Sequence, residues 1–522
     1  TTTTVNICEQ LLVSLVNFLT ECEVNSITYD IHCEILNTLI ILFSTQLFTP
    51  LEVQQGNLHC NLFLDIMFLG TANQTGVNTI DNNNNFQTVS LHTQEKSAKL
   101  VSRLLQFFIE QKPRPQNDFG QQSKAYSILQ RLTSAASVIL FLPWNAISFL
   151  SGTEVANLSS EVQRPLGDKS LLLLLLLVHR RDVCNPFKEA LCNFHDTNFD
   201  PLDQESGPAQ DVMRVSLNDL VNVMIKNLTD DRAILLLYFL IHGNNLFCSY
   251  LLSRTDLDAI MLPLLSVLYD AVNYKPQQIY MILISIFILS QDQAFNKNIH
   301  NLKVSAVPWY KEQLLSNISL GSLTVLVFVR IIQLNLSKLR DVYLHSNCFA
   351  TLANMSMQTT DIHPHAAHKL VKLFELLSLK YKRIADKLNP TELEHEQQGE
   401  QVQPVISFST QAYEETSELS TYGDFLQMVL KIINSMIFHG LPHNPHLVYA
   451  LLYQQNLFLQ FQQSPKFGDL VSNIQKVTTY FHEGLEKAGL TEWSAEIVLQ
   501  TIKKCSLSWK NSSLTPFTEL HF

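Results

Sequence analysis

Three histidines near the middle of the chain, His363, His365 and His368, lie close enough in sequence to share a metal ion. Imidazole is a common ligand of zinc and copper. However, His363 precedes Pro364, and only His365 and His368 fall on one face once a helix begins. We therefore interpret the group as a polar cap ahead of the next helix.

A second group, His439, His443 and His446, surrounds a predicted turn and is interpreted in the same way. Either group could instead be a pH-sensitive contact, because imidazole titrates near physiological pH. Cys184 and Cys192 flank a Pro-Phe-Lys segment and could form a redox pair. Buried thiols fit them better, because no neighbouring feature would lower a thiol pKa.

The sequence contains none of the glycine motifs of serine hydrolases, dinucleotide-binding folds or phosphate loops. Its two His-Glu pairs, His395-Glu396 and His482-Glu483, lack the second histidine of a zinc protease. We therefore predict no catalytic, metal-binding or cofactor-binding residue and no cofactor. An enzyme built on the histidine groups is an alternative, which the metal content of the purified protein would decide.

The composition points to helices as the elements that position these residues. The chain has 522 residues, of which 46% are hydrophobic, 16% are charged and only 15 are glycine. Sheet proteins use more glycine in turns and ligand loops. The chain has nine cysteines, which is an odd number, and no Cys-x-x-Cys pair. This pattern indicates free thiols in a reducing, cytoplasmic setting.

The net charge of −11 is not evenly distributed. Residues 389–424 carry eight acidic residues and no Lys or Arg, so the rest of the chain is nearly neutral. A nucleic-acid-binding protein should show a basic face, and we therefore predict no nucleic-acid partner.

Helical periodicity recurs along most of the chain, as in the apolar stripe between Phe425 and Ile437. Ala233–Ile241 and Ile279–Leu289 are apolar all round and must be covered on every side. Leu171–Leu177 is too short to span a membrane, and Gln313–Val329 is interrupted by polar residues. We interpret both as buried helices.

These patterns predict an all-α fold, an armadillo- or HEAT-like helical repeat solenoid with long mobile loops. We expect a solenoid over residues 1–388, with mobile loops at about 70–92 and 195–212. An acidic linker at 389–424 would follow, and then a C-terminal helical block at 425–522 that continues the solenoid.

The most basic helix predicted is His368–Lys387, where six cations, counting Lys387 at its end, stand beside an apolar stripe. Such a helix could lie on an anionic membrane or dock a partner, or it could be the solvated outer face of a repeat. The candidate membrane or partner face consists of Lys369, Lys372, Lys380, Lys382 and Arg383.

Several segments, in order along the chain, resemble the dymeclin family. The most specific are Ser253–Leu265 (SRTDLDAIMLPLL), Leu344–Ser356 (LHSNCFATLANMS) and Asn444–Tyr453 (NPHLVYALLY). Ile27–Phe48 and Phe517–Phe522 are also similar. The resemblance implies a non-catalytic scaffold without a cofactor, peripheral on the cytosolic face of the Golgi, which binds Golgi-associated proteins and supports Golgi organisation and vesicle trafficking.

The resemblance also implies a lipoprotein, since members typically begin Met-Gly and can carry N-terminal myristate. This chain begins at Thr1, so no anchor residue can be assigned, and we expect both family ends to lie outside it. An armadillo-type transport receptor or another helical-repeat adaptor is the alternative. A receptor of that type needs a ladder of Trp and Asn, whereas the four tryptophans are unevenly spaced. The sequence fixes neither the oligomeric state nor the partner.

Overall fold

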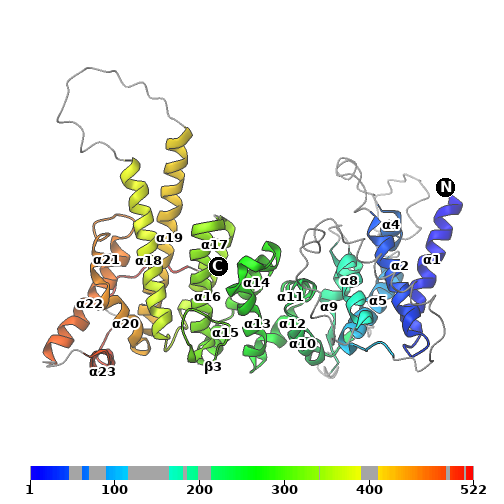
Figure 1. Cartoon of the computed structure of the whole chain (residues 1–522), viewed down its shortest axis with the longest axis horizontal. Helices are drawn as coiled ribbons and strands as arrows, with labels where there is room; N and C mark the ends of the chain where they lie inside the picture. Colours follow the sequence, from blue (N-terminus) through cyan, green and yellow to red (C-terminus); the bar gives the residue numbers. More distant parts are fainter. Residues whose placement is uncertain are drawn as a thin grey trace, which may run out of the picture. The chain divides into compact units, whose positions relative to one another are not determined.

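The computed structural model describes residues 2–45, 61–69, 90–115, 164–179, 185–197, 213–339, 341–388, 410–488, 494–510 and 513–520. Helices account for most of these residues (Figure 1), so the chain is mainly helical, as predicted. The chain divides into two compact units, residues 1–223 and 224–522. Helix α10 (Leu217–Lys226) contains the point of division.

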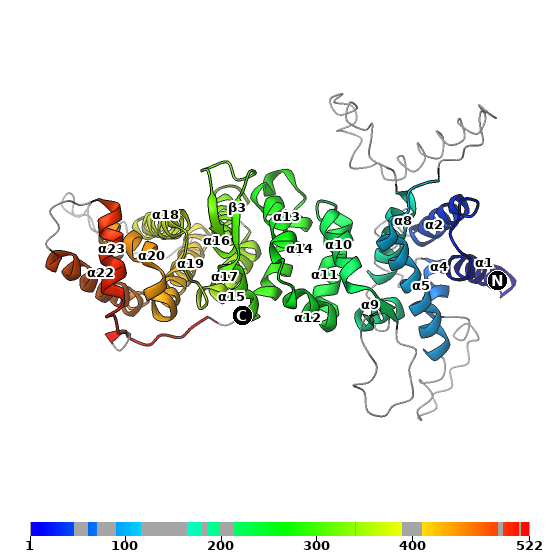
Figure 2. The same ribbon diagram turned by 90° about the horizontal axis from the view of Figure 1, so that it is seen from below.

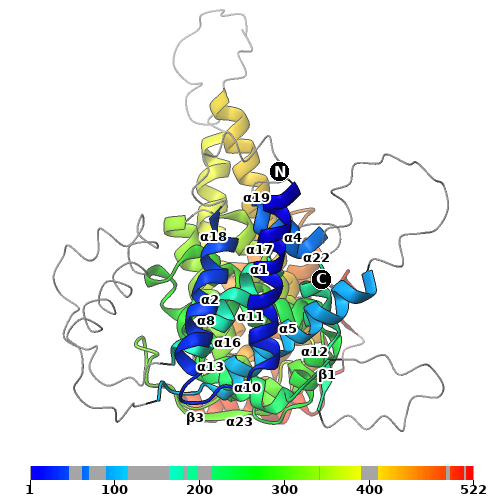
Figure 3. The same cartoon turned by 90° about the vertical axis from the view of Figure 1, so that its right-hand side faces the viewer.

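The first unit packs its helices around α5 and α8. Its elements are α1 (Thr2–Glu21), α2 (Tyr29–Phe43), α4 (Leu62–Leu69), α5 (Ser90–Glu110), α8 (Pro165–Val178), α9 (Pro186–Asn193), β1 (His195–Asp196) and β2 (Arg214–Val215). Helix α5 contacts α1, α8 and α9, and α2 packs beside α8 (Figure 3). The leucine run Leu171–Leu177 lies in α8 and is largely buried, as predicted.

The second unit contains the longer helices. Its elements are α11 (Asp231–Gly243), α12 (Asn245–Ser253), α13 (Leu257–Tyr269), α14 (Pro276–Ser290), α15 (Gln293–Asn301), β3 (Lys303–Ala306), β4 (Ser316–Ser319), α16 (Leu320–Leu334), α17 (Val342–Ser356), α18 (Pro364–Leu388), α19 (Thr410–Gly440), α20 (Pro445–Tyr453), α21 (Gln455–Leu459), α22 (Gly468–Lys487) and α23 (Ala495–Ser506). Single turns lie at Ala271–Asn273, Asn335–Leu339 and Leu441–His443.

The helices of the second unit stack in two rows (Figure 2). One row is α11, α14, α17 and α19, and the other is α13, α16, α18 and α20, with each helix contacting the next. Contacts between α13 and α14, α16 and α17, and α18 and α19 join the rows. A helix inside such an array is covered on several sides, which explains why every residue from Leu320 to Val329 is buried.

Polar side chains begin many of these helices. Asp230, Asn244, Asp292, Ser319 and Asp341 each accept a backbone N–H from the first turn of α11, α12, α15, α16 and α17, respectively. Each bond satisfies a donor that the helix itself cannot pair, so these residues fix where the apolar segments start.

A short antiparallel hairpin corrects the predicted helix at Gln313–Val329. Strand β3 pairs with β4, and α16 begins only at Leu320. Asn317 in β4 has a φ of 51°, in the left-handed region that a helix excludes. The first part of the predicted helix is therefore a loop and a strand.

The predicted irregular segments are only partly described. Residues 70–89, 198–212 and 389–409 lie outside the described residues. The structure differs from these predictions at their described ends. Ser90 begins α5, His195–Asp196 forms β1, which pairs in parallel with β2, and α19 covers 410–424, where a linker was predicted. Glutamate is a good helix former, so acidic composition alone did not separate a linker from a helix.

Among the described helices, two are long and apolar enough to cross a membrane by length and composition. They are the stretches Leu320–Ser337 and Thr416–His443, and treating the bent pairs α11–α12 and α14–α15 as single spans would add two more. The two windows are 72% and 67% buried inside the fold. Packing within the second unit therefore accounts for much of their apolar character.

The side chain of Asn444 connects two turns of the second unit. Its Nδ2 donates to the carbonyls of Thr359, at 2.7 Å, and Gly440, at 2.9 Å. Its Oδ1 accepts the N–H of Ile362 at 3.1 Å. The side chain is fully buried and makes no capping bond, while Pro445 occupies the first turn of α20. Asn444 thus joins the start of α18 to the start of α20.

Candidate functional site

Helix α18 carries the surface predicted from the basic sequence. Its apolar face, from Ala366 to Ile384, packs against α16, α19 and α20. On the opposite face, residues spaced by three or four form one line. We call this line the α18 stripe, and it consists of His365, Lys369, Lys372, Leu376, Leu379 and Arg383.

The loop between β3 and β4 covers the first part of the α18 stripe. Glu312 in this loop accepts hydrogen bonds from Lys369 Nζ and from Arg330 Nη1, both at 2.6 Å. Beside it, the hydroxyl of Tyr310 lies 3.2 Å from Nε2 of His365. One carboxylate therefore ties the loop to α16 and α18.

Of the remaining cations, two turn toward neighbouring elements. Lys380 Nζ donates to the carbonyl of Leu336 at 3.3 Å and lies over the ring of Tyr422. Lys382 donates to Oε1 of Gln460. The structure thus does not bring the five predicted cations to one face. Lys369, Lys380 and Lys382 hold elements together, and of the five only Lys372 and Arg383 are exposed.

We expect Glu312→Gln to lower the free energy of unfolding at neutral pH by about 1–2 kcal/mol. Burial would raise the pKa of Glu312, but Lys369 and Arg330 outweigh it and lower the pKa below its usual value. Such a carboxylate stabilises the fold above its unfolded pKa and loses this effect as pH falls through its folded pKa. Urea unfolding at two pH values would measure the difference, which should shrink in acid; equal midpoints at neutral pH would contradict it.

Members of both histidine groups make contacts within the fold. Nδ1 of His363 accepts the backbone N–H of His365 at 3.2 Å at the start of α18, the predicted polar cap. His439 Nε2 lies 2.6 Å from Oε1 of Glu519, and the carbonyl of His443 accepts the N–H of Asp361 at 3.0 Å. In the part of the chain that the structure describes, no three His, Cys, Asp or Glu side chains are placed to hold a metal ion.

The proposed redox pair is only half described. Cys192 is partly buried, and burial raises the pKa of its thiol, which disfavours the reactive thiolate. Cys184 lies outside the described residues.

Two other histidines are buried in the core of the second unit. His300 is 2% exposed beside Gly321, and burial lowers its pKa to about 4. His345 is 3% exposed, with its ring 4.7 Å from that of Phe425, and burial likewise lowers its pKa to about 4. Both side chains are therefore neutral in the folded protein at neutral pH.

We expect the protein to lose stability as the pH falls through the window from 6.5 to about 4, the ordinary and folded pKa values of both histidines. The unfolded chain binds protons in this window and the folded chain does not, so unfolding becomes easier. At about pH 5 the loss from His300 alone is about 2 kcal/mol, and His345 acts in the same direction. Urea unfolding at about pH 8 and about pH 5 tests this expectation; equal free energies of unfolding would contradict it.

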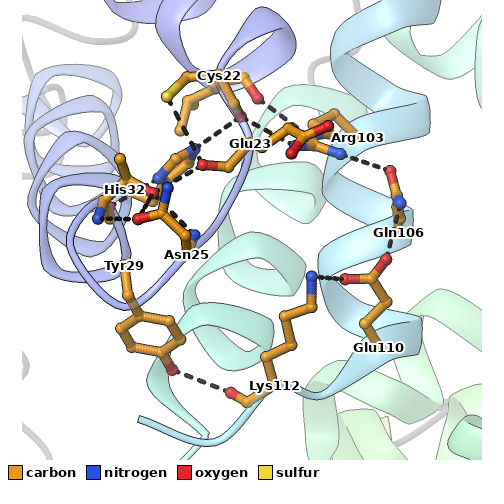
Figure 4. Close-up of polar contacts among 11 residues, drawn as sticks. Cys22, Glu23, Asn25, Tyr29, His32, Arg103, Gln106, Glu110 and Lys112 are labelled. Atoms are coloured by element: carbon orange, nitrogen blue, oxygen red, sulfur yellow. Dashed lines mark hydrogen bonds and ion pairs between the residues drawn. The ribbon is translucent and has the colours of Figure 1, made fainter. Parts of the chain in front are cut away.

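A polar cluster in the first unit was missed by sequence reasoning (Figure 4). Arg103 on α5 donates from Nε to the carbonyl of Leu19 at 3.2 Å and from Nη2 to the carbonyl of Cys22 at 3.0 Å. Its Nη1 donates to Oε1 of Gln106 at 2.8 Å, and its guanidinium lies 4.7 Å from the ring centre of Phe107. Arg103 therefore caps the end of α1, where helix carbonyls lack partners.

The turn after α1 belongs to the same cluster. The two ring nitrogens of His32 lie 2.8 Å from the carbonyl of Thr28 and 3.3 Å from that of Cys22. The hydroxyl of Tyr29 donates to the carbonyl of Lys112 at 3.0 Å. These bonds fasten α1 and α2 to the end of α5. The sequence signal for this cluster was a single arginine, Arg103, beside the apolar face of a helix.

We expect Arg103→Ala to destabilise the first unit by about 2–3 kcal/mol, because two carbonyls lose a charged donor. Arg103→Lys should recover only part of this loss, since an ammonium group cannot reproduce the spread of the guanidinium. Hydrogen exchange would detect the effect as faster exchange in α1. Unchanged protection there would show that Arg103 does not hold this helix.

These features define a helical protein in which stacked amphipathic helices are joined by polar clusters. A family profile described as "Dymeclin: Dyggve-Melchior-Clausen syndrome protein" matches residues 1–522. The chain belongs to the dymeclin family.

The relatives support this membership over nearly the whole chain. Mouse dymeclin is 35% identical over 99% of this chain and 72% of its own length. Dymeclin of Dictyostelium discoideum is 33% identical over 95% of this chain and 59% of its own, and that of Drosophila melanogaster is 31% identical over 98% and 68%. Among solved structures, an engineered protein covers 95% of the chain at 11% identity with a TM-score of 0.25, too low to support an argument.

Proposed function

We propose that this protein is a non-catalytic scaffold that binds Golgi-associated proteins at the cytosolic face of Golgi membranes and supports Golgi organisation and vesicle trafficking. The observation that carries the proposal is the family match, which extends over residues 1–522. The Golgi role is what that membership implies for this chain.

We further propose that the two rows of the second unit form an armadillo- or HEAT-like solenoid. Each helix in a row contacts the next, and the rows are joined pairwise, as repeat proteins stack their units. Such stacking produces extended surfaces that bind proteins. This arrangement favours a scaffold over a protein built around one central cavity.

The polar side chains support a binding role over a catalytic one. His363 caps a helix, Glu312 holds two cations, and Arg103 pairs with backbone carbonyls. A catalytic acid, base or nucleophile must instead be free to meet a substrate. These groups are already committed to joining helices.

We propose peripheral rather than transmembrane attachment. The two most apolar long stretches, Leu320–Ser337 and Thr416–His443, pack mostly against other helices. Moving them into lipid would require most of the second unit to come apart, which would expose its core. Attachment through contacts with Golgi-associated proteins and with the membrane surface leaves the packing of these helices intact.

Imaging and extraction together test the proposed function. The tagged full-length protein should coincide with Golgi markers, and salt or carbonate washing should release it from isolated membranes. A diffuse distribution, or a pool that only detergent releases, would contradict the proposal. The variant Leu264→Asp, which should not fold, controls for localisation caused by the tag.

A further inference from the structure

The α18 stripe is covered at one end and open at the other. The β3–β4 loop occupies His365 and Lys369, while Lys372, Leu376, Leu379 and Arg383 continue the same line without cover from the described residues. Leu376 and Leu379 are 40% and 47% exposed. We call these four residues the open stripe.

We propose that the open stripe docks a helical segment of a partner protein, with an apolar pair at its centre and carboxylates one turn to either side. This inference rests on the proposed scaffold function and deepens it by naming a surface and the chemistry of the partner. The partner is specified by the pattern of charges on this segment and by its helical shape.

The covered end shows which chemistry this helix face accepts. There, the carboxylate of Glu312 binds Lys369, and the hydroxyl of Tyr310 meets His365. The same loop places Leu315 in the core, so apolar and acidic groups approach together. The occupant that we propose repeats this pattern farther along the helix.

The order of the groups along the open stripe matches that of the proposed partner, with a cation on each side of a leucine pair. Lys372 lies four residues before Leu376, and Arg383 lies four residues after Leu379, so each cation stands one turn outside the leucine pair. The two cations are eleven residues apart, or about 16 Å along the helix axis. A partner helix of about three turns spans this distance and covers both leucines.

Neither cation is engaged by the residues that the structure describes. Among the described residues, no ion pair involves Lys372 or Arg383, whereas Lys369, Lys380 and Lys382 all have partners. A charge near an exposed leucine pair matches the usual anatomy of an interface, with an apolar centre and a polar rim. The surface is thus complementary to an acidic, amphipathic segment.

A protein partner fits the open stripe better than an anionic membrane does. Membrane-binding basic clusters contain about four to eight cations, and the open stripe has two. Glu375 is half-buried beside the stripe, Asp386 is exposed near its end, and Glu418 is exposed on the adjacent α19. These carboxylates would repel anionic headgroups, while a protein can place its own charges to avoid them.

A phage-displayed library of 16-residue helices with varied acidic, basic and apolar positions tests the proposal, with immobilised full-length protein as bait. We expect enriched sequences to be acidic and to carry two apolar residues spaced by three or four. The double variant Lys372→Glu/Arg383→Glu should weaken the binding of a selected peptide at least tenfold, and Leu376→Ser/Leu379→Ser should do the same. Raised salt should weaken binding to the parent protein.

The matched control is Lys226→Glu/Lys297→Glu, which makes the same charge change at exposed lysines elsewhere. This variant should bind the selected peptides like the parent protein, and thermal unfolding should show that all variants fold. Failure to enrich acidic sequences, or equal weakening by the control, would overturn the proposal. Recruitment to phosphatidylserine vesicles that is lost only in the Lys372/Arg383 variant would also overturn it and assign the face to lipid. Because the assay uses purified protein, its outcome does not depend on the Golgi test.

Discussion

Replacing Leu264 with aspartate is expected to unfold the second unit. Leu264 lies in α13, between α14 and α16, and none of its side chain is exposed. The change removes a buried leucine and places a carboxylate where it has no partner, at a combined cost above about 5 kcal/mol. Native domains are stable by about 5–15 kcal/mol, so the variant should melt far earlier or aggregate. Circular dichroism on heating measures this effect.

A second leucine provides the control for this prediction. Leu314, in the β3–β4 loop, is 91% exposed, so Leu314→Asp should change the free energy of unfolding by no more than about 0.5 kcal/mol. Because both variants make the same substitution, a difference between their melting temperatures reports the effect of burial alone. A Leu264→Asp protein that melts like the parent would refute the assignment of α13 to the core.

Replacing Asn444 with alanine is expected to cost about 3–5 kcal/mol, the second-largest loss that we predict. The change leaves the carbonyls of Thr359 and Gly440 and the N–H of Ile362 without their side-chain partner in a buried turn. An unsatisfied buried polar group costs about 1–3 kcal/mol, and rearrangement recovers part of the sum. Urea unfolding would give the difference.

The isosteric variant Asn444→Asp tests the same bonds in another way. It retains the acceptor for Ile362 but directs a carboxylate at two carbonyls, so it should be at least as harmful as alanine. Asn298→Ala, at an exposed position of α15, should be nearly neutral. If Asn444→Ala were as stable as Asn298→Ala, the two turns would not depend on this side chain.

Helical patterning predicted the elements well where one face is polar. The stripe from Phe425 to Ile437 lies on the buried side of α19, as its spacing indicated. Patterning failed at Gln313–Ser319, because an apolar run without charges fits a buried strand as well as a helix. It also failed at 410–424, where the chain is helical and where Glu418 and Asp424 lie exposed on α19.

The sequence predicted the candidate site as one face of a helix, but it did not predict which residues the cations on that face contact. The spacing from Lys369 to Arg383 placed basic residues beside an apolar stripe, and α18 has that stripe. Glu312 is distant in sequence from Lys369, so only tertiary structure could show that they pair. The same holds for Arg103, which binds carbonyls more than 80 residues away. Side chains that bond to distant backbone leave no periodic signal.

Proximity labelling of the full-length protein in cells tests the central claim, that this protein works by binding trafficking proteins, most directly. The labelled set should be enriched in Golgi tethers and coat components when compared with the unfolded Leu264→Asp control. Neighbours dominated by nuclear transport cargo, or a set that does not differ from the control, would contradict the scaffold function while leaving the helical fold intact.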